Sequence, residues 1–258
     1  MMQKRTVLIT GSTSGIGLSI ATAFAQQGYN LILNGLEANG PQLAETMAAE
    51  FSINADFDPA NMLDPAALRA MVSRAGEKFG GIDVLVNNAG IQYVSPIEEF
   101  PEDRWDAILG VNLTSAFHLT KAVWPFMKKQ QFGRIINIAS AHGLVASEYK
   151  SAYVAAKHGL IGFTKTIALE GAPCGITANA ICPGYVKTAL VDKQIADQAR
   201  THQLSEQDVV EKILLAKQAL KQFIPAESIA ALCLFLASES AATLTGAALP
   251  IDGGWTAQ

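Results

Sequence analysis

The sequence predicts a doubly wound α/β protein built on one parallel sheet, and three observations support this prediction. Short apolar runs alternate along the 258-residue chain with stretches in which apolar residues recur at helical spacing, as at Ile20, Ala23 and Phe24. The runs are almost continuously apolar, which is typical of strands that helices cover on both faces. Neither a repeat nor a compositional shift divides the chain, so we expect a single domain over residues 1–258.

Seven apolar runs are the predicted strands. In chain order they occupy residues 7–10, 30–33, 53–57, 82–86, 134–139, 177–181 and 247–251. Helical patterns separate them, including one over 151–169 and one that starts near residue 226. The interval between residues 181 and 226 has a helical pattern but no strand. A connection of about forty residues is usually functional, so we expect a substrate lid over about 188–222, with a packing excursion as the alternative.

Composition limits the classes of partner. Charged residues make up 16% of the chain and the net charge is −4, without a Lys/Arg cluster that could follow a nucleic-acid backbone. No apolar run approaches the roughly 18 residues that a membrane helix needs, and the short run after the first residues is broken by Gly11 and Gly15. Cys174, Cys182 and Cys233 form no CxxC pair. We therefore expect a cytoplasmic protein with free thiols that binds no nucleic acid, membrane or metal.

A glycine-rich turn follows the first predicted strand and opens the first helix. Glycines in such a turn let the backbone bend tightly and approach a pyrophosphate, whose charge is favoured at a helix N-terminus. The predicted cofactor residues here are Gly11, Thr13, Gly15, Ile16 and Gly17. A plain tight turn is the alternative for this motif taken alone.

The end of the second predicted strand indicates which dinucleotide binds. Leu36 and Glu37 follow that strand, and neither 11–17 nor 31–43 contains an Arg or Lys that would neutralise a 2′-phosphate. NAD-binding proteins usually place an acidic group here and NADP-binding proteins a basic one. The sequence therefore favours NAD.

Tyr153 and Lys157 are the candidate chemical pair. Their spacing of four places both side chains on one face of the predicted helix. A phenol has an unperturbed pKa of about 10, and a neighbouring ammonium together with an oxidised nicotinamide favours the phenolate, so Tyr153 is a candidate proton acceptor. Ser140 and the segment 87–90 end two predicted strands, at the sheet edge where open α/β sheets bind ligands.

The motifs Thr-Gly-x-x-x-Gly-Ile-Gly, Asn-Asn-Ala-Gly, Ser, Tyr-x-x-x-Lys and Pro-Gly occur in this order, so the whole chain resembles the short-chain dehydrogenase/reductase family. The resemblance implies a Rossmann-type fold in which Tyr153 is the general base and Lys157 lowers its pKa and holds the nicotinamide ribose. It also implies that Ser140 orients the substrate and that Asn112 holds a water in the proton path. The further cofactor contacts that it implies are Asn88, Ala89, Gly90, Val186 and Thr188, with Asn61 and Met62 where the family commonly has an acidic adenine contact.

A finer resemblance within the family concerns the groups around this pair. It implies NAD-dependent interconversion of (R)-3-hydroxybutyrate and acetoacetate, a reaction of ketone body metabolism. The resemblance to the wider family, whose members are commonly homotetramers, implies a homotetramer. The implied substrate residues are Gln92, His142, Lys150, Gln194 and Trp255. One cation with several donors beside the reacting oxygen suits a small carboxylate substrate. Each of these residues also has a purely structural explanation. The lysine would be a solvated charge, the histidine a satisfied loop residue, the two glutamines surface amides, and the tryptophan part of the core or of an interface.

Two other functions stay open at this point. A 3-oxoacyl thioester reductase that uses NADPH shares the fold and the core motifs, although it requires a basic residue for the 2′-phosphate. A non-catalytic dinucleotide sensor would retain the fold without needing Ser140 or Tyr153, both of which this chain has.

Overall fold

Seven parallel strands form one sheet in the order β3-β2-β1-β4-β5-β6-β7. The structure is a computed structural model that describes residues 4–188, 191, 195, 199 and 204–257. The strands are β1 (Thr6–Ile9), β2 (Asn30–Asn34), β3 (Ala55–Asp58), β4 (Val84–Asn87), β5 (Gly133–Ile138), β6 (Ile176–Pro183) and β7 (Ala248–Ile251). The strand order reverses between β1 and β4, which is where open α/β sheets place their ligands. The predicted fold class is confirmed.

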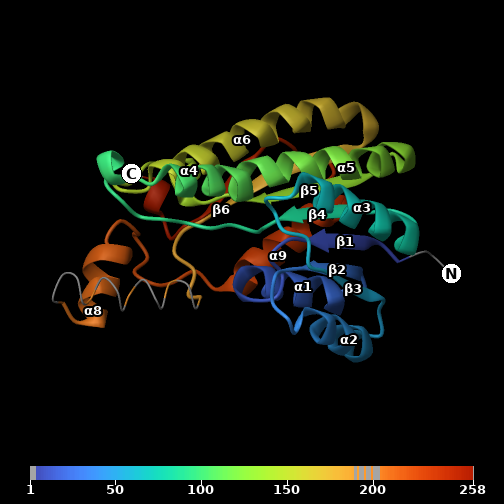
Figure 1. Cartoon of the computed structure of the whole chain (residues 1–258), viewed down its shortest axis with the longest axis horizontal. Helices are drawn as coiled ribbons and strands as arrows, with labels where there is room; N and C mark the ends of the chain where they lie inside the picture. The colour runs from blue at the N-terminus through green and yellow to red at the C-terminus, as the bar shows by residue number, and fades with distance from the viewer. Residues whose placement is uncertain (1–3, 189–190, 192–194, 196–198, 200–203, 258) are drawn as a thin grey trace.

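Helices cover both faces of the sheet (Figure 1). One face carries α1 (Gly15–Gln26), α2 (Gly40–Phe51) and α9 (Ala226–Ala237), and the other carries α3 (Pro65–Phe79), α5 (Ser115–Gln130) and α6 (Ser151–Gly171). Val7 and Ile9 of β1 pack in the first core and Leu8 in the second, because successive strand side chains point to opposite faces. The strands are continuously apolar because helices cover both faces of the sheet, as predicted.

The third strand begins later than predicted. Ser52 adopts the left-handed conformation with φ of 52°, and the Ile53 N–H donates to the Ala48 carbonyl oxygen at 3.2 Å. Ile53 therefore closes the C-terminal turn of α2 instead of joining the sheet. The apolar residues of a helix cap and of the strand that follows it form one run in the sequence, so the run alone placed the boundary two residues early.

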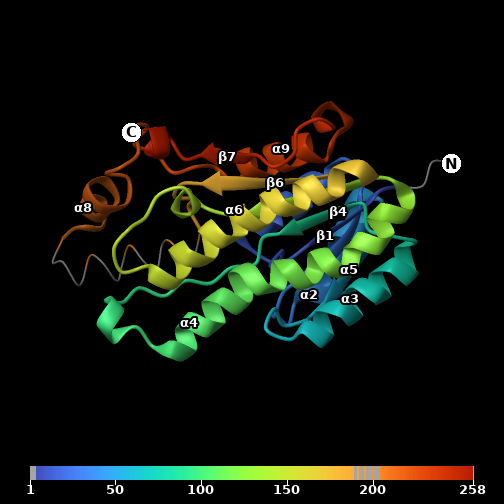
Figure 2. The same ribbon diagram turned by 90° about the horizontal axis from the view of Figure 1, so that it is seen from above.

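The segment between β6 and α9 lies beyond the carboxyl ends of the strands (Figure 2). It includes α8 (Glu206–Val209) and a π-type turn, Val210–Leu214. Among its described residues, strand pairing is limited to the isolated bridge between Val186 and Ile224. Val191, Ile195, Val209 and Leu214 are buried together against Tyr185, so the segment has a small apolar core of its own.

No helix in the described part of the chain combines the length and apolar character needed to cross a bilayer.

Candidate active site

The glycine-rich turn between β1 and α1 forms a cradle whose shape excludes side chains. Gly11 and Gly15 have φ of +60° and +53°, a conformation that favours glycine. A Cβ on Gly17 would lie 2.1 Å from the Gly11 carbonyl oxygen. Helix α1 follows with no acidic residue in its first turn and no side-chain hydrogen bond from its N-cap residue Ser14. Its first N–H groups and the helix dipole are therefore available to an anion such as a pyrophosphate.

Asn88, at the end of β4, holds this cradle. Its Nδ2 donates to the carbonyl oxygens of Thr10 at 2.9 Å and Gly11 at 3.0 Å. The Thr10 hydroxyl oxygen accepts in return from the backbone N–H groups of Asn88 and Ala89, each at 3.0 Å. These four bonds tie β4 to the turn after β1 at the point where the strand order reverses, which gives the Asn-Asn-Ala-Gly motif a physical role.

Asn34 is a supporting residue that the sequence analysis missed. It is buried at the end of β2, and its Nδ2 donates to the carbonyl oxygens of Asp58 and Ala60 at 3.0 and 2.9 Å. Its Oδ1 accepts from the Gly11 N–H at 3.3 Å. The signal was present in the sequence, because an amide that ends an apolar strand must find partners when it is buried.

Glu37 lies against the cradle. Its carboxylate accepts from the Thr13 hydroxyl at 2.5 Å and from the Leu36 N–H at 3.0 Å. The Thr13 hydrogen bond is the main cause that lowers the pKa of this carboxyl below its usual value. Glu37 therefore carries a negative charge at neutral pH beside the turn, while the Leu36 side chain is 72% exposed next to it.

Asn61 and Met62 follow β3, at the position where the family resemblance implies an adenine contact. The Asn61 Oδ1 accepts from the Leu63 N–H at 2.9 Å, and Met62 is buried. An amide oxygen has two lone pairs, so that of Asn61 retains capacity for one more donor. Its contact with an adenine stays a prediction.

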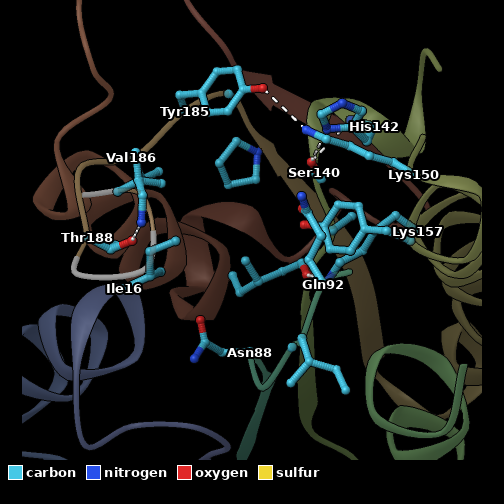
Figure 3. Close-up of a pocket in the computed structure, with 18 of the residues that line it drawn as sticks. Ile16, Asn88, Gln92, Ser140, His142, Lys150, Lys157, Tyr185, Val186 and Thr188 are labelled. Atoms are coloured by element: carbon cyan, nitrogen blue, oxygen red, sulfur yellow. Dashed lines mark hydrogen bonds between the residues drawn. The ribbon is translucent and has the colours of Figure 1, made fainter. Parts of the chain in front are cut away.

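A cavity of about 190 Å³ opens at the carboxyl edge of β4, β5 and β6. Figure 3 shows its lining, with Ile16, Val186 and Thr188 toward the cradle, and Ser140, His142 and Lys150 on the far side. The predicted residues that it brings together are Ile16, Asn88, Gly90, Gln92, Ser140, His142, Lys150, Tyr153, Lys157, Val186, Thr188 and Trp255. The cofactor and substrate halves predicted from the sequence thus share one cavity.

Tyr153 and Lys157 lie one helical turn apart on α6, as predicted. The Lys157 Nζ is 5.6 Å from the centre of the Tyr153 ring and donates to the Ile138 carbonyl oxygen at 2.8 Å. Burial lowers the pKa of Lys157 to about 8. Burial also raises the pKa of the Tyr153 phenol, and a hydrogen bond with the Ser140 side chain opposes that shift. The lowering of this pKa by Lys157 stays a prediction.

Asn112 lies in a π-type turn, Gly110–Thr114, that precedes α5. Its side chain donates to the carbonyl oxygen of Ile91 and accepts from the N–H of Ile91, both at 2.8 Å. The amide therefore fixes the loop after β4 next to Gly90, whose Cβ, if present, would lie 3.2 Å from the Asn112 Oδ1. This pairing shows a structural role for the side chain, and the proposed water contact stays a prediction.

Three polar side chains face the Ser140 end of the cavity. The His142 N–H donates to the Ser140 Oγ at 3.1 Å, and burial lowers the pKa of the His142 imidazole to about 3, so it is neutral at pH 7. Burial, with the nearby charge of Lys217, lowers the pKa of Lys150 to about 8, which leaves it mostly charged at pH 7. The Gln92 Nε2 is buried and has no hydrogen-bond partner among the described residues. An unpaired buried donor that lines a cavity is suited to a ligand acceptor.

Trp255 closes the same end of the cavity. It is 6% exposed, its ring meets the His142 ring edge-on at 4.9 Å between centroids, and it stacks on Tyr185 at 5.6 Å. Tyr185 is a pocket residue that sequence reasoning passed over, because the motif around it pointed to Val186 and Thr188. The expected contact from Gln194 lies outside the described residues.

Within the described ranges, no group of three or more His, Cys, Asp and Glu side chains could hold a metal ion. All three cysteines are free thiols, and Cys182 and Cys233 are buried.

Comparisons with known proteins show which proteins the chain resembles. The model of the short chain dehydrogenase family matches residues 5–199. A D-beta-hydroxybutyrate dehydrogenase of Rhizobium meliloti is 52% identical over 98% of this chain and 99% of the relative, and one of Cupriavidus necator is 51% identical over the full length of both. A crystal structure of an actinorhodin polyketide ketoreductase variant with NADPH superposes with a TM-score of 0.93 at 31% identity, covering 100% of this chain and 99% of the other.

Proposed function

Because the chain belongs to the short-chain dehydrogenase family, we propose that it interconverts (R)-3-hydroxybutyrate and acetoacetate by hydride transfer with NAD. One observation carries the choice of substrate: the Lys150 ammonium, the neutral His142 and the unpaired Gln92 donor line the cavity beside Ser140 and Tyr153. A short carboxylate satisfies these groups while its hydroxyl lies next to the phenol. The name shared by the two relatives that are about half identical supports the same substrate.

The residues of the cradle fit a nicotinamide dinucleotide. Gly17 leaves no room for a Cβ and Gly11 has a positive φ that favours glycine, which suits a tight turn whose backbone a pyrophosphate can approach closely. Ile16, Val186 and Thr188 line the cavity where the cradle meets it, so they would hold the nicotinamide end. When bound, the nicotinamide supplies the acceptor for the hydride that leaves the substrate carbon bearing the hydroxyl.

Tyr153 would take the hydroxyl proton, and Ser140 would hold the reacting oxygen through its own hydroxyl. Lys157 would keep a positive charge one turn from the phenol, which favours the phenolate at the moment of proton transfer. Asn112 would hold a water that passes the proton to solvent. These roles follow the family resemblance. Three contacts support them: Asn112 bonds to Ile91, Lys157 bonds to Ile138, and Tyr153 bonds to Ser140.

We choose NAD over NADP because Glu37 carries its charge at the cradle. A 2′-phosphate beside this carboxylate would meet like charge, whereas a 2′-hydroxyl can donate to it. Tyr185 and Val186 precede the segment 188–222, which we propose as the lid, with Gln194 as its contact to the carboxylate.

We also propose a cytoplasmic homotetramer. Helices α5 and α6 flank β5 and carry exposed apolar side chains, Phe117 at 44% and Leu169 at 77%, which suit burial against a second copy. The free thiols support a reducing compartment.

One spectrophotometric experiment tests the function. Oxidation of (R)- and (S)-3-hydroxybutyrate is followed through NADH absorbance with NAD and with NADP, and the reverse reaction with acetoacetate and with its thioester. We expect turnover of the (R) acid with NAD and of free acetoacetate with NADH. Preference for the thioester and NADPH would instead identify a 3-oxoacyl reductase.

A further inference from the structure

Tyr185 has its backbone fixed on both sides. Its N–H donates to the Gln218 Oε1 at 3.2 Å, and its carbonyl oxygen accepts from the Ile224 N–H at 2.8 Å. Gln218 is fully buried, and its Nε2 also donates to the carbonyl oxygens of Leu220 and Gln222. The position of Tyr185 is therefore set by the chain that follows α8 as well as by β6.

The ring of Tyr185 has a fixed orientation too. It stacks on the Trp255 ring with an interplanar angle of 8°, and Trp255 in turn meets His142 edge-on at 84°. Stacked aromatic pairs lose little conformational entropy on binding a ligand, because each ring already has few rotamers to lose. The Tyr185 hydroxyl is thus held at a defined point of the cavity wall.

The hydroxyl is the partner of Lys150, the cation at the Ser140 end of the cavity. The Lys150 Nζ donates to the Tyr185 hydroxyl oxygen at 3.3 Å, as Figure 3 shows, and lies 5.5 Å from the centre of the Tyr185 ring. Lysine has a long, flexible side chain, so without such a partner its ammonium samples many positions. Lys150 precedes Tyr153 by three residues at the start of α6, so anchoring its ammonium also sets the distance from the cation to the reacting phenol.

The same hydroxyl retains a proton to donate. A phenol that accepts one hydrogen bond still has its own O–H, and burial raises the pKa of Tyr185 to about 12, so the group is protonated at pH 7. Lys150 and Tyr185 together therefore present an ammonium and an O–H donor on one wall of the cavity.

We propose that Tyr185 is a specificity-determining residue that selects carboxylate substrates, by holding the Lys150 ammonium in place and by donating its own hydroxyl proton to the same carboxylate. The proposal rests on the proposed function, since it names a further residue of that substrate site. It differs from a wall residue in that its effect depends on the charge of the substrate.

The test compares acetoacetate with its methyl ester, which has the same keto group without the negative charge. Tyr185→Phe keeps the stacked ring and removes only the hydroxyl. We expect the KM for acetoacetate to rise about tenfold, as for loss of a hydrogen bond to a charged group, while the KM for the ester and both kcat values change less than about twofold. Tyr149→Phe is the matched control, because Tyr149 is 54% exposed and adjoins Lys150 in the chain; it should leave every value unchanged.

A double-mutant cycle separates the two partners. In a Lys150→Met background, Tyr185→Phe should raise the acetoacetate KM by clearly less than the tenfold expected in the wild-type background, because the effect that acts through Lys150 is gone while the loss of the hydrogen bond from the Tyr185 hydroxyl remains. Two results would overturn the proposal: full additivity of the two substitutions in their effect on the acetoacetate KM, or a ratio of the acid KM to the ester KM that Tyr185→Phe leaves unchanged. So would loss of NADH binding or of the folded state in Tyr185→Phe, which would assign the hydroxyl to the fold.

Failure of the proposed function has a different signature. If the wild-type protein turns over neither (R)-3-hydroxybutyrate nor acetoacetate with any cofactor, that function is wrong. Calorimetric titration of the wild-type and Tyr185→Phe complexes with NADH by acetoacetate then tests the role of Tyr185 directly. About tenfold weaker binding in the variant supports it, and equal binding refutes it.

Discussion

The proposed cofactor half and the proposed substrate half of the cavity are built in opposite ways. The cradle uses backbone atoms and missing side chains: Gly11, Gly15 and Gly17 make room, and Asn88 locks the turn through backbone carbonyls. The substrate half uses long or aromatic side chains that come from widely separated segments, such as Gln92, Lys150 and Trp255. A backbone site suits a ligand that many proteins share, whereas a side-chain site can change its selectivity by single substitutions without disturbing the sheet.

The largest expected effect separates chemistry from cofactor binding. Tyr153→Phe should lower kcat by about a thousandfold, within the range for loss of a general acid or base. The affinity for NADH, measured by fluorescence titration, should change less than twofold, because the cradle does not involve the hydroxyl. Retention of more than a tenth of the wild-type kcat would show that Tyr153 is not the base.

A pair of glycine substitutions tests whether the cradle depends on close backbone approach. Gly17→Ala places a Cβ 2.1 Å from the Gly11 carbonyl oxygen, and we expect it to destabilise the fold by about 2 kcal/mol and to lower the Tm by roughly 4–8 °C. Gly162→Ala, on the exposed face of α6, meets no heavy atom within 4 Å and should raise the Tm slightly. Calorimetry of both variants checks this contrast; equal shifts would remove the steric argument.

The substrate half should respond to pH through its cation. Because the pKa of Lys150 is about 8, its charge is present below that pH and is lost as the pH rises through it. At saturating NADH, the KM for acetoacetate should be flat below pH 8 and rise about tenfold per unit above it, whereas the KM for the methyl ester should follow no such trend. The pKa of Lys157 is also about 8, so the ester distinguishes the two lysines. A parallel rise for the ester would place the titration outside the carboxylate site.

The smallest effect concerns the choice of cofactor. Glu37→Ala should improve the kcat/KM ratio of NADP to NAD by about fivefold, because one exposed charge near a 2′-phosphate is partly screened by salt. Glu45→Ala, on the exposed surface of α2, is the matched control and should leave the ratio unchanged. If Glu37→Ala has no effect, another group determines the preference for NAD.

The sequence was sufficient where the signal is local. Apolar periodicity predicted all seven strands, and the spacing of Tyr153 and Lys157 placed them on one helical face. It failed where the cause is tertiary. Asn34 bonds to Asp58 and Asn112 bonds to Ile91, and in each pair the two residues are more than twenty positions apart in the chain. The anchoring of Lys150 by Tyr185 joins residues 35 positions apart, and no spacing rule connects them.

The position of Trp255 also bears on how the enzyme matures during synthesis. Trp255 follows β7, which among the described strands pairs with β6 alone, so the aromatic wall cannot assemble until β7 has joined the sheet. A nascent chain that already has the dinucleotide cradle would still lack the surface against which its acid docks. If Trp255 closes the substrate site as proposed, a chain terminated before this strand would retain the glycine-rich cradle without a complete substrate pocket.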